Sequence, residues 1–290
     1  MNIKFRALII ILILAISAGI AAGSAARRCS EAVFIPDEKI PLLTVMYHSF
    51  SPDTAKCGKY VVTPDTFESD VKYLLSNGYS FVDTRDLTAY CKSGSPLPEK
   101  PVMITIDDGH YSCYHYIFPI MKKYGVKAVI APIAAESDKY SDSMDLNPAY
   151  SNMCWDNIKE MYESGHGDIQ NHSYDMHRTD SHTRGCARLK GEAADTYRQR
   201  LYSDLKKADD AIYAATGNRP CAMLYPFGLT SKEAGEVIDR LGYTVTVSCT
   251  EGITLLSRDA KSLRMIKRYN RPHGRSSEEF FKGKDRLPVQ

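Results

Sequence analysis

Two adjacent carboxylates at the end of an apolar run are the side chains in this sequence best suited to chemistry. Residues 102–106 are mainly apolar and β-branched, and Asp107, Asp108 and Gly109 follow them directly. A short run of this kind is typical of a strand that is buried on both faces, as in a parallel sheet. Two acids at its end are costly to bury unless a metal ion or a proton-transfer role stabilises them there.

These two acids can reach one site although they are neighbours in the chain. On a regular strand Asp107 and Asp108 point to opposite faces, but Gly109 allows the chain to turn sharply after them. One acid can then ligate a cation while the other stays free as a base. The alternative is a solvated Asp-Asp-Gly turn, which is the commoner outcome for such a segment alone. The other motifs of the chain are needed to choose between the two.

A pair of histidines forms the second candidate site. His172 follows Asn171, and His177 comes five positions later. Imidazoles near a strand end suit a divalent metal ion. A spacing of five places two side chains roughly 140° apart on a helix, so the segment must be a loop or a distorted turn if both bind one ion. Two unrelated polar histidines are the alternative.

The elements that position these residues alternate between strands and helices. Thr63 and Pro64 predict a helix start, because Thr caps helices and Pro fits the first helical position. Loops are expected at 135–153 and 178–190. Strands are predicted at residues 41–48, 80–82, 102–106, 126–132, 168–172, 222–225, 243–248 and 264–269. This alternation indicates a parallel sheet, so we expect an α/β fold, a distorted or incomplete (β/α) barrel of about seven parallel strands.

The candidate residues share one position in this scheme, directly after a predicted strand. His48, Asp107, Asp108, His172 and the segment 226–227 all follow one. In (β/α) barrels the site is built at the carboxyl ends of the strands. We therefore expect these residues to converge on one rim.

Composition sets the class of protein. The chain has 290 residues, 43% of them hydrophobic, which suits one domain with a sizeable core, and its formal charge of +2 carries no nucleic-acid signature. The 8 cysteines are scattered without a Cys-x-x-Cys pair, so a cysteine zinc site is not expected. An even number in an exported chain permits disulfides, whose pairing the sequence leaves open.

The N-terminal segment predicts export. Lys4 and Arg6 precede an apolar run over 7–22, and small residues follow it. This pattern is typical of a signal peptide or an N-terminal membrane anchor over 1–28, with the protein secreted or attached to the extracytoplasmic face of the membrane. We expect a lead-in at 29–41, a catalytic domain at 42–275 and a tail at 276–290 that is polar apart from Phe280 and Phe281 and that frays.

Together the motifs resemble the polysaccharide deacetylase family, the NodB homology fold of carbohydrate esterase family 4, over roughly 42–250. Residues 105–109 are similar to its Thr-Phe-Asp-Asp-Gly signature. The spacing of His172 and His177 resembles the subgroup that deacetylates poly-β-1,6-N-acetylglucosamine. Residues 46–48 resemble the Met/Tyr-His segment that opens that subgroup, and 224–228 resemble its Tyr-Pro-Tyr/Phe-Gly motif.

The resemblance implies a metal-dependent hydrolase that removes acetyl groups from N-acetylglucosamine units of an extracellular or cell-wall polysaccharide. It implies that Asp108, His172 and His177 bind a divalent cation, with Zn²⁺ preferred and Co²⁺, Ni²⁺ or Mn²⁺ as alternatives. It also implies that Asp107 is the general base. The expected partner is the polysaccharide, and the expected state is a monomer that does not bind nucleic acid.

The remaining roles are less well matched to the family. By resemblance, the backbone N–H of Phe227 stabilises the oxyanion, and Tyr225 and Pro226 shape the acetyl pocket. The Arg that begins the third motif of chitin and peptidoglycan deacetylases is absent from that position, and the Leu-x-His motif that supplies their general acid has no clear counterpart. His48 and His273 are the candidates for the acid.

Two other functions fit the same motifs. One is an O-acetyl esterase acting on xylan or a related glycan, since an alcohol needs less protonation than an amine to leave and so tolerates a weak acid. The other is a catalytically inactive carbohydrate-binding member of the fold. Loss of Asp107 or of a metal ligand would indicate the inactive member, and the sequence keeps all of them.

Overall fold

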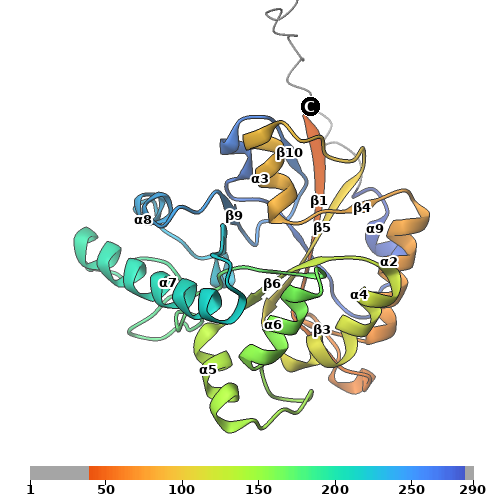
Figure 1. The fold of residues 1–290 in the computed structure, drawn as a ribbon, viewed down its shortest axis with the longest axis horizontal. Helices are drawn as coiled ribbons and strands as arrows, with labels where there is room; N and C mark the ends of the chain where they lie inside the picture. The colour runs from red at the N-terminus through yellow and green to blue at the C-terminus, as the bar shows by residue number, and fades with distance from the viewer. Residues whose placement is uncertain (1–38, 285–290) are drawn as a thin grey trace, which may run out of the picture. The chain divides into compact units, whose positions relative to one another are not determined.

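A computed structural model describes residues 39–284 of the chain. Its main sheet has the strand order β10-β1-β5-β6-β7, with β11 beside β1 and β4 beside β5 (Figure 1). A second, two-stranded sheet contains β8 and β9. The strands of these sheets are β1 (Ile40–Tyr47), β4 (Ser80–Phe81), β5 (Pro101–Asp108), β6 (Ala128–Pro132), β7 (Gly167–Ile169), β8 (Ala222–Leu224), β9 (Val245–Val247), β10 (Thr254–Leu256) and β11 (Tyr269–Asn270).

The strands pair in parallel, with one exception. β5 lies between β1 and β6, and the register joins Thr105 to Met46 on one side and to Val129 on the other. β10 runs antiparallel to β1 at the edge. Single bridges pair Asn171, which follows β7, with Met223 of β8, and Ile266, which lies between β10 and β11, with Val247 of β9. The ring is thus interrupted, which confirms the prediction of an incomplete barrel with a mostly parallel sheet.

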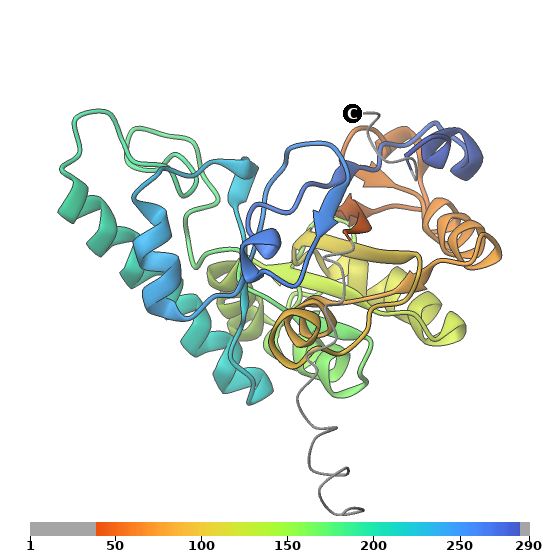
Figure 2. The ribbon, with the colours of Figure 1, turned by 90° about the horizontal axis from the view of Figure 1, so that it is seen from above.

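Helices follow the strands as the sequence predicts. At the start of α2 the Thr63 hydroxyl accepts a hydrogen bond from the backbone N–H of Thr66 at 3.1 Å, and Pro64 is the first helical residue. In both views α7 and α8 lie beside β8 and β9, and α2 and α4 lie at the opposite end of the main sheet (Figure 1, Figure 2). The helices are α2 (Pro64–Ser76), α3 (Thr84–Ser93), α4 (Phe118–Tyr124), α5 (Ala134–Ser143), α6 (Trp155–Glu163), α7 (Ala194–Thr216), α8 (Ala234–Leu241) and α9 (Ser277–Phe281).

The core covers both faces of β5. Val102, Ile104 and Ile106 belong to one buried cluster, and Met103 belongs to a second cluster. Because successive side chains on a strand alternate between its faces, this division shows that the strand is buried on both. The carboxyl end of β5 is therefore held rigidly where Asp107 and Asp108 begin the site.

Three sequence predictions are wrong. Residues 135–153 are not all loop, because α5 spans Ala134–Ser143 and buries mainly small residues that give no apolar periodicity. The strand predicted at 264–269 is reduced to one bridge at Ile266 and the short β11. The tail at 276–290 does not fray at its start, because α9 buries Phe280 and Phe281, and Phe281 stacks on Tyr73 of α2.

Some predictions lie outside the described residues. The signal peptide or anchor at 1–28 and most of the lead-in at 29–41 belong to this group. Among helices within 39–284, none is long and apolar enough to cross a membrane. The cysteines that the structure describes are free thiols: Cys57, Cys91, Cys113, Cys154, Cys186, Cys221 and Cys249.

Candidate functional site

The two acids at the end of β5 reach one cavity through a sharp turn. Asp108 adopts a left-handed backbone conformation with φ 69°, and Gly109 follows at φ 73°. A Cβ added to Gly109 would lie 2.8 Å from the Cβ of Pro132, so only glycine fits here. Non-glycine residues seldom adopt this conformation and are strained in it. The turn places both carboxylates in the wall of a cavity of about 430 Å³, as the sequence predicts.

Asp108, His172 and His177 form a compact cluster at this cavity. Their ligand atoms lie within 4.8 Å of one another. The Oδ1 atom of Asp108 is 3.1 Å from Nε2 of His177 and 3.4 Å from Nε2 of His172. The Nδ1 atom of His172 donates to the carbonyl oxygen of Leu224 at 2.7 Å, which fixes the ring with Nε2 toward the cluster.

The segment between the histidines is a tight loop. Ser173 has φ 74°, and its backbone N–H donates to Oδ1 of Asn171 at 2.7 Å. Asp204 of α7 accepts hydrogen bonds from the backbone N–H groups of Tyr174 at 2.8 Å and Asp175 at 3.0 Å. His172 and His177 are therefore joined by a loop and not by a helix, as their five-residue spacing requires if both are to face one ion.

The cluster fits a divalent cation. Oδ1 of Asp108 and Nε2 of His172 are buried and make no hydrogen bond to any described residue. Buried polar atoms without partners are costly, and a cation would satisfy both. Burial raises the pKa of Asp108, but His110, His172 and His177 lower it more, so it stays well below its usual value and the carboxyl is ionised. One carboxylate and two imidazoles leave positions open, as catalytic metal sites require.

Asp107 is paired with an arginine that the sequence analysis did not assign to the site. Nη1 of Arg268 donates to Oδ1 of Asp107 at 2.7 Å and to the Thr105 hydroxyl at 3.0 Å, and its Nε donates to the Ser248 carbonyl at 2.8 Å. Burial raises the pKa of Asp107, but the Arg268 guanidinium and the imidazoles of His172 and His48 together lower it by more, so the pKa lies below its usual value. Asp107 is thus held ionised, as a proton acceptor must be.

The structure separates the two candidates for the general acid. His48 lines the cavity together with Asp107 and Asp108, and its ring lies 4.7 Å from the ring of Tyr60. Burial lowers the pKa of His48, and the two carboxylates partly offset this effect. His273 is not among the lining residues, and its backbone N–H donates to the Gly58 carbonyl at 2.8 Å.

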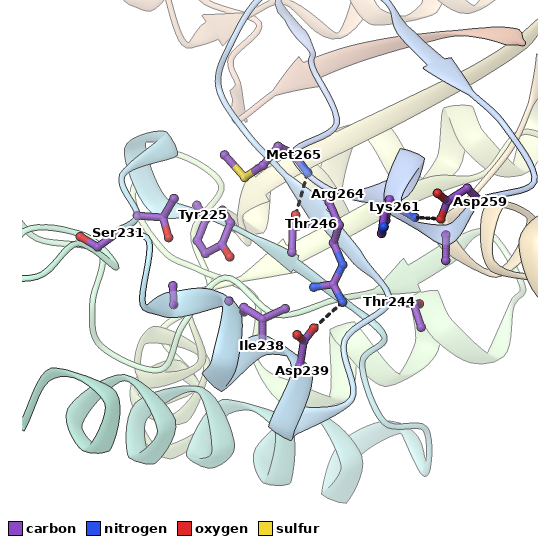
Figure 3. A pocket seen from close by; sticks show the side chains of 14 residues that line it. Tyr225, Ser231, Ile238, Asp239, Thr244, Thr246, Asp259, Lys261, Arg264 and Met265 are labelled. Atoms are coloured by element: carbon purple, nitrogen blue, oxygen red, sulfur yellow. Dashed lines mark hydrogen bonds and ion pairs between the residues drawn. The ribbon is translucent and has the colours of Figure 1, made fainter. Parts of the chain in front are cut away.

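Tyr225 and Pro226, predicted to shape the acetyl pocket, do not line the cavity, whereas Phe227, predicted to stabilise the oxyanion, does. Phe227 has φ 58°, is 46% exposed and places its ring 4.3 Å from that of His177. Pro226 is buried beneath it. Tyr225 faces a different cavity of about 640 Å³, which also contains the ion pair between Arg264 and Asp239 at 2.8 Å (Figure 3).

That second cavity is larger, but its chemistry is poorer. It lies between α8 and the short helix η4 (Ala260–Leu263), and Figure 3 shows Lys261 and Asp259 on the side opposite Tyr225. Arg264 is neutralised by Asp239, and the only group within 39–284 that could hold a metal ion lies in the other cavity. Size therefore does not identify the functional site in this molecule.

Comparisons with known proteins agree on one family. The family model described as polysaccharide deacetylase matches residues 94–246. The poly-β-1,6-N-acetyl-D-glucosamine N-deacetylase of Escherichia coli strain K12 is 23% identical over 236 residues, covering 74% of this chain and 35% of that protein. The protein of the same description in Staphylococcus aureus strain MRSA252 is 25% identical over 205 residues, covering 70% of this chain and 66% of that protein. The chain thus matches about a third of the length of the first relative.

Solved structures share the fold. The Streptococcus pyogenes deacetylase PplD in complex with acetate superposes with a TM-score of 0.67 at 22% identity, covering 85% of this chain and 99% of that one. IcaB from Ammonifex degensii gives 0.66 at 23% identity, covering 80% and 92%. At this level of identity the likeness establishes the architecture alone.

Proposed function

The chain belongs to the polysaccharide deacetylase family, and we propose that it is a metal-dependent N-deacetylase that acts on N-acetylglucosamine units of a polysaccharide. One observation carries the proposal. The acid held ionised by Arg268 and the cluster of Asp108, His172 and His177 line the same cavity. An amide hydrolase needs both a proton acceptor and an electrophile at one place.

The cluster would hold the cofactor. A divalent cation bound by Asp108, His172 and His177 supplies Lewis-acid chemistry, by polarising the acetyl carbonyl and making water easier to deprotonate. We propose Zn²⁺, with Co²⁺, Ni²⁺ and Mn²⁺ as alternatives, because imidazole and carboxylate ligands suit all of these ions. The hydrogen bond from His172 to the Leu224 carbonyl keeps the imidazole in the orientation and tautomer that ligation requires.

Asp107 would accept the proton of the attacking water. Its ionised state is maintained by Arg268, which also fixes the orientation of the carboxylate through Oδ1. A positioned base of this kind contributes about 10²–10⁴ in rate. Arg268 itself is held by Thr105 and Ser248, so the base is supported by three buried contacts and cannot easily rotate away.

His48 and Phe227 would complete the reaction. His48 lines the cavity with Asp107 and is proposed to donate a proton to the departing nitrogen, which must leave as an amine. The backbone N–H of Phe227 is proposed to stabilise negative charge on the acetyl oxygen. His273 is left without this role because it does not line the cavity.

The polymer and the location are proposed from the relatives and from the sequence. The named relatives are N-deacetylases of poly-β-1,6-N-acetylglucosamine, and we propose the same polymer here. The positive and apolar N-terminal residues 1–28 support export, with the protein secreted or attached at the extracytoplasmic face. A polysaccharide outside the cell would then be accessible to the site.

The test is acetate release, measured with and without chelator. A β-1,6-linked N-acetylglucosamine pentamer should release acetate, chelation should stop the release, and added Zn²⁺ should restore it. Asp108→Asn should lose most of its metal and its activity together, because a ligand is removed. Asp107→Asn should keep its metal and lose about 10²–10⁴ in rate, because the amide cannot accept a proton.

The control substrate is an O-acetylated xylan oligomer. Faster release from that oligomer than from the pentamer would assign the site to ester hydrolysis. No release from either substrate by metal-loaded protein would indicate an inactive member of the fold. Loss of metal in Asp107→Asn with normal metal in Asp108→Asn would mean that the roles of the two acids are exchanged.

A further inference from the structure

A cavity of about 360 Å³, here called the side cavity, lies beside the cavity that holds Asp108, His172 and His177, here called the metal cavity. Ser49 and His110 belong to the walls of both. We propose that the two cavities form one groove that binds consecutive sugar units of the polymer, with Tyr150 as the platform for the unit next to the one being deacetylated. This inference rests on the proposed function. It assigns substrate recognition to a loop that carries none of the motifs of the family.

The shared wall places the two cavities in direct contact. His110 lies next to the metal cluster, with its Nε2 3.6 Å from Oδ2 of Asp108, and its side chain is 34% exposed. A sugar chain that leaves the metal cavity on this side meets His110 and then the side cavity. His110 and Ser49 thus form the wall between the position of the reacting unit and that of its neighbour.

The loop that carries Tyr150 is fixed to the ligand-bearing turn. The backbone N–H of Tyr111 donates to the Ser151 carbonyl at 2.9 Å, and that of Met153 donates to the Gly109 carbonyl at 2.8 Å. The side-chain amide of Asn152 donates to the carbonyl of Asp108 at 2.7 Å. A loop held by three hydrogen bonds to the metal-binding turn offers a preorganised surface, which lowers the entropic cost of binding.

Tyr150 has the properties of a sugar platform. The residue is 56% exposed, and its hydroxyl donates to Oδ1 of Asp145 at 2.8 Å, which orients the side chain. Tyr60 is also exposed, at 47%, and lines the metal cavity. An aromatic face packs well against the apolar face of a pyranose ring, and two such rings in adjoining cavities suit two sugar units.

The charges of the groove suit a neutral polymer. Asp53 and Lys56 line the side cavity, and Lys59 and Glu251 line the metal cavity. Each cavity thus has one acid and one base at its wall besides the catalytic groups. A glycan with a charge on every unit would find no excess of opposite charge here, whereas uncharged N-acetylglucosamine units can use all four side chains as hydrogen-bonding partners.

The test compares substrates of different length. Initial rates on β-1,6-linked N-acetylglucosamine dimer and pentamer give kcat and KM for the metal-loaded protein. Tyr150→Ala should raise KM for the pentamer about tenfold, with kcat nearly unchanged, because it removes a platform and leaves the reacting groups intact. The preference for pentamer over dimer should fall by a similar factor.

Two variants serve as controls. Tyr150→Phe keeps the ring and should stay within about twofold of the parent protein. Tyr213→Ala removes a tyrosine of similar exposure, 45%, from α7, which lines neither cavity, and should change nothing. Metal content and the thermal midpoint of each variant show that the loop and the site remain folded.

The outcomes separate this inference from the proposed function. An unchanged KM for the pentamer in Tyr150→Ala, with acetate still released, overturns the groove and leaves the deacetylase intact. A loss of kcat with an unchanged KM overturns it as well, since Tyr150 would then act on the reacting groups. If the parent protein releases no acetate from the pentamer, the proposed function fails, and the groove fails with it.

Discussion

Residues 39–284 contain two buried pairs of arginine and aspartate, and the contacts of the two pairs differ. Arg268 pairs with Asp107 at the cavity, and Arg271 pairs with Asp70 of α2. The arginines flank the short strand β11, and none of the four side chains is more than 2% exposed. Burying such a pair is costly, so each must gain enough contacts to offset the loss of water.

In the pair at α2 both oxygens of the carboxylate accept hydrogen bonds. Nε and Nη2 of Arg271 donate to both oxygens of Asp70, at 2.7 and 3.0 Å, and the hydroxyl of Tyr47 donates to the same carboxylate at 2.8 Å. The other donors of Arg271 reach the carbonyls of Pro272 and Arg275. This pair joins β1, α2 and the C-terminal segment, and it does not line the cavity.

The pair at the cavity is arranged differently. Arg268 reaches Asp107 through Oδ1 alone, and its remaining contacts go to Thr105, Ser248 and the thiol of Cys249. Asp107 also lines the cavity, whereas Asp70 does not. A buried acid that is neutralised on one side and open on the other is ready to accept a proton. Both pairs are buried, so burial does not distinguish them. The difference lies in the carboxylate, because Asp107 keeps an oxygen free of hydrogen bonds to Arg268 and Asp70 does not.

The largest effect should come from Arg268→Met. Arg268 lowers the pKa of Asp107, so its removal raises that pKa, and the ionised base then forms only at higher pH. The rate at neutral pH should fall by about 10²-fold or more, and the acidic limb of the pH–rate profile should move to higher pH. Acetate release from the pentamer across a pH series measures both changes.

Arg271→Met is the matched control for Arg268→Met, because it removes the same group from the other pair. Its folded fraction should keep the parent pH–rate profile. If the acidic limb moved equally in both variants, the two pairs would not differ in function. A profile that stayed fixed in Arg268→Met would show that Asp107 is not the base whose ionisation limits the rate.

Arg271→Met should affect stability instead. The change leaves the charge of Asp70 buried beside Tyr47 without its partner, and breaking such a pair costs about 3–5 kcal/mol. The guanidinium also lies 4.7 Å from the ring centre of Phe280, so the packing of α9 should loosen. Urea titration gives the free energy of unfolding.

The double variant Asp70→Leu with Arg271→Met provides the check for this second effect. Replacing both members of a buried pair by apolar residues is often neutral, so most of the stability should return. If the double variant stayed as unstable as Arg271→Met alone, shape and not charge would explain the loss.

Much of the site could be predicted from sequence, because its residues directly follow strands. His48, Asp107, Asp108 and His172 each come at the end of a predicted strand, and the carboxyl ends of parallel strands meet at one edge. Arg268 could not be placed, because it lies 161 positions from Asp107 and no spacing joins them. The strand predicted at 264–269 did hold a usable signal, since Arg268 needs a counter-charge wherever it is buried.

The misread elements have different physical causes. α5 buries Ala134, Ser137 and Tyr140, which are mostly small or polar, so the apolar period of a helix is missing. α9 is short, but Ser276 and Glu279 form a capping box that marks its start. Tyr225 was assigned to the acetyl pocket from its motif, and the direction of its side chain depends on the register of β8, which no local pattern reveals.

The smallest of the three effects concerns Tyr47, which adjoins His48 at the end of β1. Successive residues of a strand point to opposite faces, and here Tyr47 reaches the pair at α2 while His48 lines the cavity. Tyr47→Phe removes one hydrogen bond to a charged group and should cost about 1.5 kcal/mol at pH 7, with kcat unchanged. Tyr213→Phe, at an exposed site on α7, should stay within about 0.5 kcal/mol of the parent protein.

The pH dependence of this loss identifies its origin. Burial and the charge of Asp70 hold the pKa of Tyr47 well above its usual value. A raised pKa in the folded state means that the stabilisation is complete below the unfolded value of about 10 and is lost as the pH rises above it. The difference in unfolding free energy between the parent protein and Tyr47→Phe should therefore be constant from pH 7 to 9 and shrink above pH 10, because the other tyrosines titrate alike in both proteins. A difference that persists undiminished above pH 10 would show that the pKa of Tyr47 is not raised in the folded protein. A change in kcat would show that the two pairs are coupled through β1.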